Sequence, residues 1–273
     1  MAKILCDNIL PIMKLYSTIV LASALAGFTC SINAELVAYF PIDSTTDTST
    51  FIDDVIDDAT HAISDGTGNN NTGSIVFDST RGGDVISTVQ GHRYSAGTQD
   101  IDLTEGFTWS FWFKSPSLDF HDSDSSNGDT IIGTRSDSGQ TWHKVQPKSV
   151  ERWSSFGGYS VDTGNWHHVA YTGAGTGASA TFNLWVDGVN VATDTGATFD
   201  SLATYNNNFE IGGSGKFSED VQGLIDDIAV WNEVLSDQRI IDLSNGAAVV
   251  PEPSTLALIG LASLALFIRR LRA

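Results

Sequence analysis

Three aromatic residues, Trp142, Trp153 and Tyr159, share one polar segment and have the side-chain types that can stack against sugar rings. Ser, Gly and Gln residues lie between them, and the polar groups of Ser and Gln can bond sugar hydroxyls. The segment is therefore a candidate carbohydrate-binding site. The alternative is that these rings, with the neighbouring Phe156, pack in a core or at the edge of a sheet.

The chain lacks the residue spacings of common hydrolases. Glycoside hydrolysis needs two carboxylates that face each other across the scissile bond, and no Glu-x-Asp-x-x-Glu spacing occurs. His-Glu-x-x-His and Gly-x-Ser-x-Gly are also absent. His167 and His168 are adjacent in an expected strand, so they point to opposite faces and cannot chelate one ion together. The sequence therefore predicts that this protein is not an enzyme.

The charge balance is strongly acidic. The chain has 33 acidic and 14 basic residues, which gives a formal net charge of −19. This excludes nucleic-acid binding through a general basic surface. High negative charge keeps a protein soluble and can collect divalent cations. An alternative function is therefore that of structural matrix cargo without a specific ligand.

The N-terminal segment 1–34 is predicted to be a secretory signal peptide. An apolar run covers 15–28 and follows a positive residue, and Ala34 ends a small-residue cleavage site. The residues before Met13 interrupt this pattern, so translation is expected to start at Met13. Cleavage after Ala34 would remove both cysteines, which suits an oxidising compartment.

The C-terminal segment 249–273 has three parts. In order, they are Pro251, Glu252 and Pro253, an apolar run over 256–268, and the basic pair Arg269 and Arg270. At about 1.5 Å per residue, a membrane helix over this run is shorter than the ~30 Å hydrocarbon core. Basic residues after it would stay on the cytoplasmic side.

This end resembles the PEP-CTERM sorting signal of Gram-negative envelope proteins. The resemblance implies export through the inner membrane, recognition by an exosortase and cleavage near the Pro-Glu-Pro motif. It also implies delivery to the cell envelope or the extracellular matrix. A permanent single-span anchor is the alternative.

The body of the chain, 35–248, is predicted to be one all-β domain. Aromatic residues recur at every second position over 107–113, which is typical of a strand with one buried face. Residues 181–186 alternate as well, and Asp187 and Gly188 then form a tight turn into a return strand. The size fits a single sandwich or barrel.

The rest of the body is expected to be loops, further strands and one helix. Ser236 is a good N-cap for this helix, and Gly246 ends it. Long acidic loops are expected at 44–58, 64–73 and 118–129.

Seven motifs give this body a family resemblance. They are LVAYFPID at 36–43, GFTWSFWFK at 106–114, NWHHVA at 165–170, LWVDG at 184–188, IGG at 211–213, GLIDDIAVW at 223–231 and LSD at 235–237. In this order they resemble a laminin-G-like domain of the concanavalin A-like lectin/glucanase fold. The resemblance implies a jelly-roll sandwich of two antiparallel sheets, in a family whose members bind glycans, proteins or both.

The same resemblance implies a structural calcium ion. Domains of this fold often hold one with an Asp near the last strand and with groups from the early loops. Matched by motif, the ligands are Asp227 (or Asp226), Asp43 and Asp58. The loop after Asp58 departs from the Asp-Ser-Ser-Gly-Asn that is usual in the family. The alternative is an acidic surface without a bound ion.

Together these features predict an exported, non-catalytic module that binds carbohydrate or a cell surface. Its expected partners are the secretion machinery, an exosortase, and a polysaccharide or surface glycan. Structural matrix cargo is the alternative, and a glycoside hydrolase-like enzyme is the weakest of the three hypotheses.

Overall fold

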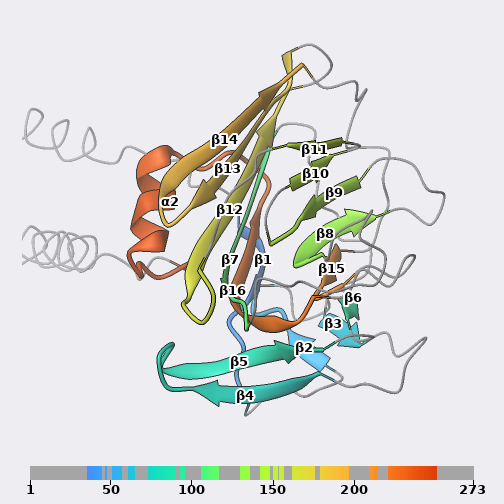
Figure 1. The fold of residues 1–273 in the computed structure, drawn as a ribbon, viewed down its shortest axis with the longest axis vertical. Helices are drawn as coiled ribbons and strands as arrows, with labels where there is room; N and C mark the ends of the chain where they lie inside the picture. The colour runs from blue at the N-terminus through green and yellow to red at the C-terminus, as the bar shows by residue number, and fades with distance from the viewer. Residues whose placement is uncertain are drawn as a thin grey trace, which may run out of the picture. The chain divides into compact units, whose positions relative to one another are not determined.

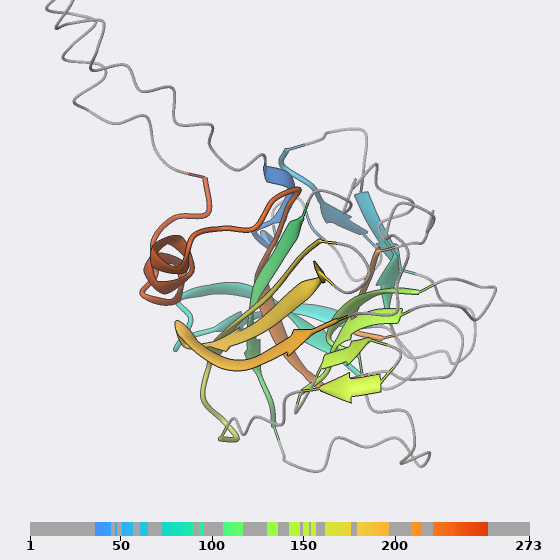
Figure 2. The same cartoon turned by 90° about the horizontal axis from the view of Figure 1, so that it is seen from above.

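The computed structural model describes residues 36–44, 47, 51–56, 61–64, 73–89, 93–95, 106–116, 130–135, 142–147, 150–152, 154–156, 162–175, 179–196, 209–213 and 221–250. All of them belong to one compact unit that spans 34–273. Two antiparallel sheets face each other, and a short helix lies outside one of them (Figure 1, and from above in Figure 2). The predicted all-β sandwich of two antiparallel sheets is confirmed.

Sheet A contains the longest strands of the described part. Its order is β14-β13-β12-β7-β16-β5-β4, and β1 also pairs with β16. The strands are β1 (Leu36–Phe40), β4 (Ser74–Asp78), β5 (Gly83–Thr88), β7 (Phe107–Lys114), β12 (His167–Ala174), β13 (Thr181–Val186), β14 (Val189–Thr195) and β16 (Gly223–Trp231).

Sheet B is built from shorter strands in the order β11-β10-β9-β8-β15-β6-β3-β2. The strands are β2 (Phe51–Asp53), β3 (His61–Ser64), β6 (Tyr94–Ser95), β8 (Ile132–Arg135), β9 (Trp142–Val145), β10 (Val150–Arg152), β11 (Ser154–Phe156) and β15 (Phe209–Ile211). The sequence predicted a continuous loop over 44–58, but β2 interrupts it, because Ile52 is fully buried in the core.

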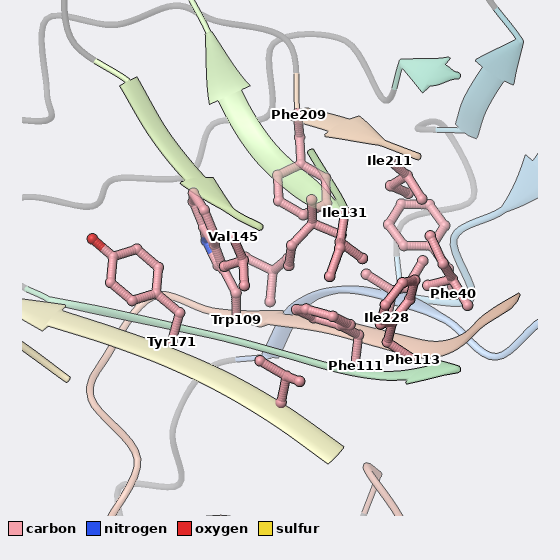
Figure 3. Close-up of a cluster of buried hydrophobic side chains, with 14 of the residues drawn as sticks. Phe40, Trp109, Phe111, Phe113, Ile131, Val145, Tyr171, Phe209, Ile211 and Ile228 are labelled. Atoms are coloured by element: carbon pink, nitrogen blue, oxygen red, sulfur yellow. The ribbon is translucent and has the colours of Figure 1, made fainter. Parts of the chain in front are cut away.

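Aromatic side chains fill the space between the sheets. Figure 3 shows part of this cluster, in which β7 contributes the alternate residues Phe107, Trp109, Phe111 and Phe113. The centroid of the Trp109 ring lies 5.6 Å from that of Tyr171 and 5.5 Å from that of Phe209. The alternating aromatic residues of β7 therefore form its inward face, because successive side chains of a strand point to opposite sides.

A second apolar cluster covers the outer face of sheet A, under helix α2 (Asp237–Ser244). Its members are Ala170, Trp185, Ala229, Trp231, Leu235, Ile240, Leu243 and Val249. Ser236 caps the helix by accepting a hydrogen bond from the Arg239 backbone N–H, and Gly246 follows its end with φ of 85°. The predicted helix is thus present, at the place that its cap and terminal glycine indicate.

The stretch after α2 is fixed to the helix. Arg239 donates hydrogen bonds of 2.8 Å from Nη2 to the backbone carbonyls of Ala248 and Val249. The Ala247 N–H bonds the Asp242 carbonyl at 2.9 Å, and Val249 is buried in the outer apolar cluster. The chain therefore stays folded up to the residue before the last one described.

Within the described part of the chain, no helix combines the length and apolar character needed to cross a membrane.

Candidate functional site

A pocket of about 400 Å³ opens on the outer face of sheet A; we call it the outer-face pocket. Its floor comes from strands β1, β7, β12 and β16, through Tyr39, Ser110, Trp112, His168, Asp226 and Asp227. The turn between β4 and β5 forms one wall with residues 81–84. The other wall is Leu243 of α2 and the stretch 246–250.

The pocket exists because β16 changes partners halfway along its length. On the side away from β7, residues 223–225 pair with β5, and residues 228–231 pair with β1. Asp226 and Asp227 lie between these two paired stretches. The register with β7 also shifts here, and Asp227 has a left-handed φ of 50°, as in a β-bulge. A bulge next to a gap in the pairing turns two consecutive carboxylates toward one place.

Three pocket residues form a row across the sheet. Trp112 of β7 pairs with Asp226 on one side and with His168 on the other. The Trp112 and His168 rings meet edge to face, with centroids 5.4 Å apart. The neighbouring His167 instead bonds Asp162 and Asp187, so the adjacent histidines have separate surroundings, as strand geometry predicts.

Arg81 brings a positive charge to this row. Its Nε donates a hydrogen bond of 2.6 Å to Asp226 Oδ2, and its Nη2 bonds Asp227 Oδ2. The guanidinium carbon lies 4.3 Å from the centroid of the Trp112 ring, which is cation–π distance. One side chain therefore bonds both carboxylates and covers the indole.

Asp78 holds the turn that carries Arg81. Its carboxylate accepts hydrogen bonds from the Thr80 and Arg81 backbone N–H groups and from Lys114 Nζ at 2.9 Å. The Trp166 indole N–H donates to it as well. These bonds, first that of the Thr80 hydroxyl, hold the pKa of Asp78 well below its usual range. The turn is therefore a fixed part of the pocket wall.

Two buried polar atoms of the pocket have no hydrogen-bond partner among the described residues. They are Asp226 Oδ1 and His168 Nδ1, whose residues are only 5% and 2% exposed. Burial, and then the charge of Asp227, raise the pKa of Asp226 to about 7. Burial lowers the pKa of His168 to about 4, so this imidazole is neutral at neutral pH. Unpartnered buried groups are costly, so such a pair points to a bound ligand or ordered water.

The arrangement suits binding better than hydrolysis. Asp226 and Asp227 are consecutive on one strand, and Arg81 bonds both of them. Glycoside hydrolysis instead uses carboxylates on opposite sides of the bond that breaks. Tyr39 donates a hydrogen bond of 2.7 Å to Asp227 Oδ1, and burial followed by the Asp227 charge raises the pKa of this phenol. Asp227 is thus fully engaged inside the protein.

The predicted calcium ligands are only partly placed. Asp227 lines the pocket, whereas Asp43 is exposed in the loop after β1, where its N–H bonds Asp47 at 2.6 Å. Asp58 lies outside the described residues. Within the described ranges, no three His, Cys, Asp or Glu residues gather as a metal site would require. The residues placed here do not by themselves fit a calcium ion, and the ion stays a prediction.

The predicted aromatic site belongs to a different part of the fold. Trp142 is the first residue of β9 in sheet B, whereas the outer-face pocket lies on sheet A. Trp153 and Tyr159 lie outside the described residues, so this site stays a prediction. The sorting-motif residues also lie outside them; they are Pro251, Glu252, Pro253, Arg269 and Arg270.

Sequence reasoning missed Arg81, Trp112 and His168 as pocket residues. One signal was available for Trp112, because it interrupts the polar side of an otherwise alternating strand. Arg81 carried no such signal. It reaches Asp226 only because a turn folds it over the sheet, across a separation of 145 residues.

Comparison with known families gives two matches. Residues 87–241 match the concanavalin A-like lectin/glucanases superfamily, and residues 249–272 match the PEP-CTERM protein-sorting motif. No curated protein sequence matches the chain.

Several solved structures have the same fold. Domain 4 of an extracellular arabinanase from Geobacillus stearothermophilus, solved with arabinotriose, is 17% identical with a TM-score of 0.58. The match covers 77% of this chain and 98% of that domain. The binding domain of Paraclostridial Mosquitocidal Protein 1 is 14% identical, with a TM-score of 0.53 and coverage of 77% and 52%.

A sialidase from Trypanosoma rangeli is 16% identical, with a TM-score of 0.52. The match again covers 77% of this chain, but only 32% of the sialidase. At these identities the likeness concerns the fold, and it fixes neither ligand nor activity.

Proposed function

Since this chain belongs to the concanavalin A-like lectin/glucanases superfamily and carries a PEP-CTERM sorting motif, we propose that it is an exported, non-catalytic carbohydrate-binding module. An exosortase would process it, and it would act in the cell envelope or extracellular matrix of a Gram-negative bacterium. The domain of the arabinanase named above, solved with a bound trisaccharide, supports carbohydrate as the ligand class.

One observation carries the proposal. The outer-face pocket presents two buried polar atoms without protein partners, Asp226 Oδ1 and His168 Nδ1, beside an aromatic ring. Sugar hydroxyls are both donors and acceptors, so they can satisfy a carboxylate oxygen and a ring nitrogen together. A pocket of about 400 Å³ is within the range of small-ligand sites.

The same pocket supports the non-catalytic part of the proposal. Its two adjacent carboxylates already share one guanidinium, which holds them at one place in the floor. A general acid and a nucleophile of a glycosidase would need different surroundings on opposite sides of the sugar.

The test is a panel of polysaccharides and oligosaccharides, titrated into the purified protein with calcium and with a chelator. We expect saturable binding without turnover of the sugar. Asp226→Asn should weaken this binding. Trp142→Ala, Trp153→Ala and Tyr159→Ala test the aromatic site that the sequence predicts. Loss of binding in the aromatic variants alone would move the site there.

Other outcomes distinguish the alternatives. Binding to no carbohydrate under either condition would favour structural matrix cargo, and release of reducing ends would show an enzyme. Identical melting midpoints with calcium and with chelator would show that the protein does not bind the predicted calcium ion.

A further inference from the structure

We propose that the outer-face pocket binds the ammonium group of an amino sugar, so that the ligand is a polysaccharide with non-acetylated amino groups. This inference rests on the proposed function, because it names the carbohydrate class for the same site. Three features support the proposal. They are the charge of the pocket lining, the two polar atoms without hydrogen-bond partners, and the contacts that Arg81 makes in the pocket.

The lining of the pocket is acidic. Among the described residues that line it, the carboxylates are those of Asp84, Asp226 and Asp227, and the cation is Arg81. His168 is neutral at neutral pH, because burial lowers its pKa. An excess of carboxylates in a partly enclosed site attracts a cation and repels a carboxylate. Uronic and sialic acids are therefore poor ligands for this pocket.

The unpartnered atoms need donors at two places. Asp226 Oδ1 is an acceptor from a residue that is 5% exposed, and His168 Nδ1 can accept or donate according to its tautomer. These residues are two strand spacings apart, which is about 10 Å between backbones. One sugar residue can therefore offer its ammonium group to Asp226, while a hydroxyl from another part of the same oligosaccharide addresses His168.

Arg81 demonstrates that a nitrogen cation is stable in this place. Its guanidinium bonds Asp226 and Asp227 and lies over Trp112. It uses only Oδ2 of Asp226 and leaves Oδ1 without a partner. A ligand ammonium at Oδ1 would complete the coordination of this carboxylate by cations. Acetylation would remove the charge on which such an interaction depends.

The test compares two trisaccharides that differ only in acetylation. Glucosamine trisaccharide and N-acetylglucosamine trisaccharide are titrated by calorimetry into the purified full-length protein at neutral pH and low salt. We expect the non-acetylated probe to bind about tenfold tighter or more, because a hydrogen bond to a charged group contributes that much. Glucuronic acid oligomers should bind more weakly than either.

Variants separate the pocket from the general acidity of the protein. Asp226→Asn should remove the preference for the non-acetylated probe. The matched control is Asp237→Asn, which makes the same substitution at an exposed position in the first turn of α2 and should leave the preference unchanged. Equal affinities of the wild type and Asp226→Asn for the glucosamine probe would overturn the proposal, because overall charge would then explain the binding.

A second variant covers the case in which Asp226→Asn disturbs folding. Gly83 lines the pocket, and a Cβ at this position meets no atom within 4 Å. We therefore expect Gly83→Phe to fold and to obstruct the pocket while leaving Asp226 and Arg81 themselves unchanged in sequence. We expect it to abolish binding of the glucosamine probe with the melting midpoint preserved, and unchanged binding would place the ligand elsewhere.

The failures of the two proposals differ. Equal binding of both trisaccharides, or preference for neutral glycans, would overturn the amino-sugar inference and leave carbohydrate binding intact. Binding of poly-lysine at the same pocket, with no glycan bound, would overturn both in favour of a basic protein partner.

Discussion

His167 and His168 are consecutive residues with opposite surroundings. His167 lies 2.8 Å from Asp187 and 2.6 Å from Asp162 through its two ring nitrogens. Burial alone would lower the pKa of His167, but these two carboxylates outweigh it and raise the pKa. His168 has no hydrogen-bond partner for Nδ1 among the described residues, and burial lowers its pKa to about 4.

The two residues should therefore affect stability with opposite dependence on pH. The stabilisation by His167 is fully present below its ordinary pKa of 6.5 and is lost as pH rises through its raised pKa. For His168 the unfolded chain takes up the proton first, so folding weakens by up to about 3 kcal/mol as pH falls from 6.5 toward 4. Melting of His167→Gln and His168→Gln from pH 4 to 8 measures this. We expect the loss of stability relative to the wild type to be largest in acid for His167→Gln. For His168→Gln this loss should be smallest in acid. The same trend in both variants would contradict the assignment.

Arg81 is the second residue with a decisive local role. Removing one member of a buried charge pair leaves the other without compensation, which costs about 3–5 kcal/mol in the best-buried cases. Since Arg81 is 18% exposed at its side chain, we expect Arg81→Ala to cost about half of that. Adding Asp226→Asn should recover part of the loss, and a double-mutant cycle in denaturant measures the coupling. Independent, additive effects would show that the pair is not coupled.

At the scale of elements, β12 depends on one glycine. Gly173 lies opposite Phe107 in β7 and Phe182 in β13. A Cβ at Gly173 would stand 2.4 Å from Phe107 Cε1 and 2.6 Å from Phe182 Cδ1. Glycine is therefore needed here for the two rings to pack across the strand.

Gly173→Ala should destabilise the fold by about 1–3 kcal/mol, because an overpacked core must displace side chains. Gly83→Ala is the control, since its Cβ meets nothing within 4 Å and its backbone is not left-handed. Free energies of unfolding in urea provide the comparison. Equal costs for the two variants would refute the packing argument.

Elements with local signals could be predicted, and the pocket could not. The period of β7, the turn at Asp187 and Gly188 and the cap at Ser236 each depend on neighbours in sequence. The outer-face pocket depends on the gap where β16 exchanges β5 for β1, which is a property of long-range pairing. The acidic pair 226–227 indicated a polar site, but not that an arginine of the same chain would bind it.

At the scale of the whole molecule, the sandwich has two apolar layers of different kinds. The inner layer joins the sheets, and the outer layer joins sheet A to α2 and the stretch before the sorting motif. The second layer was not evident in the sequence, because Trp185 and Trp231 belong to strands whose other face already enters the core. The pocket lies at the margin of this layer, so one of its walls depends on the position of residues 246–250.

The attachment of residues 247–249 to α2 limits where the chain can be trimmed. A peptidase needs an extended substrate, and cleavage sites follow the hydrogen bonding and burial of the backbone. Arg239 donates hydrogen bonds to the carbonyls of Ala248 and Val249, and Val249 as a residue is only 8% exposed. The secreted form should therefore keep Val249 attached to α2, and with it the pocket wall.

Intact mass of the exported protein measures its new end directly. We expect a terminus beyond Val249 in the wild type, and in Arg239→Ala a ragged set of shorter ends. Gln238→Ala, on the exposed side of the same helix, should process like the wild type. A wild-type end within α2 would contradict this view. If the wild-type terminus lies beyond Val249, processing removes the sorting motif and leaves the pocket intact. The protein would then be able to bind its ligand from the moment of release.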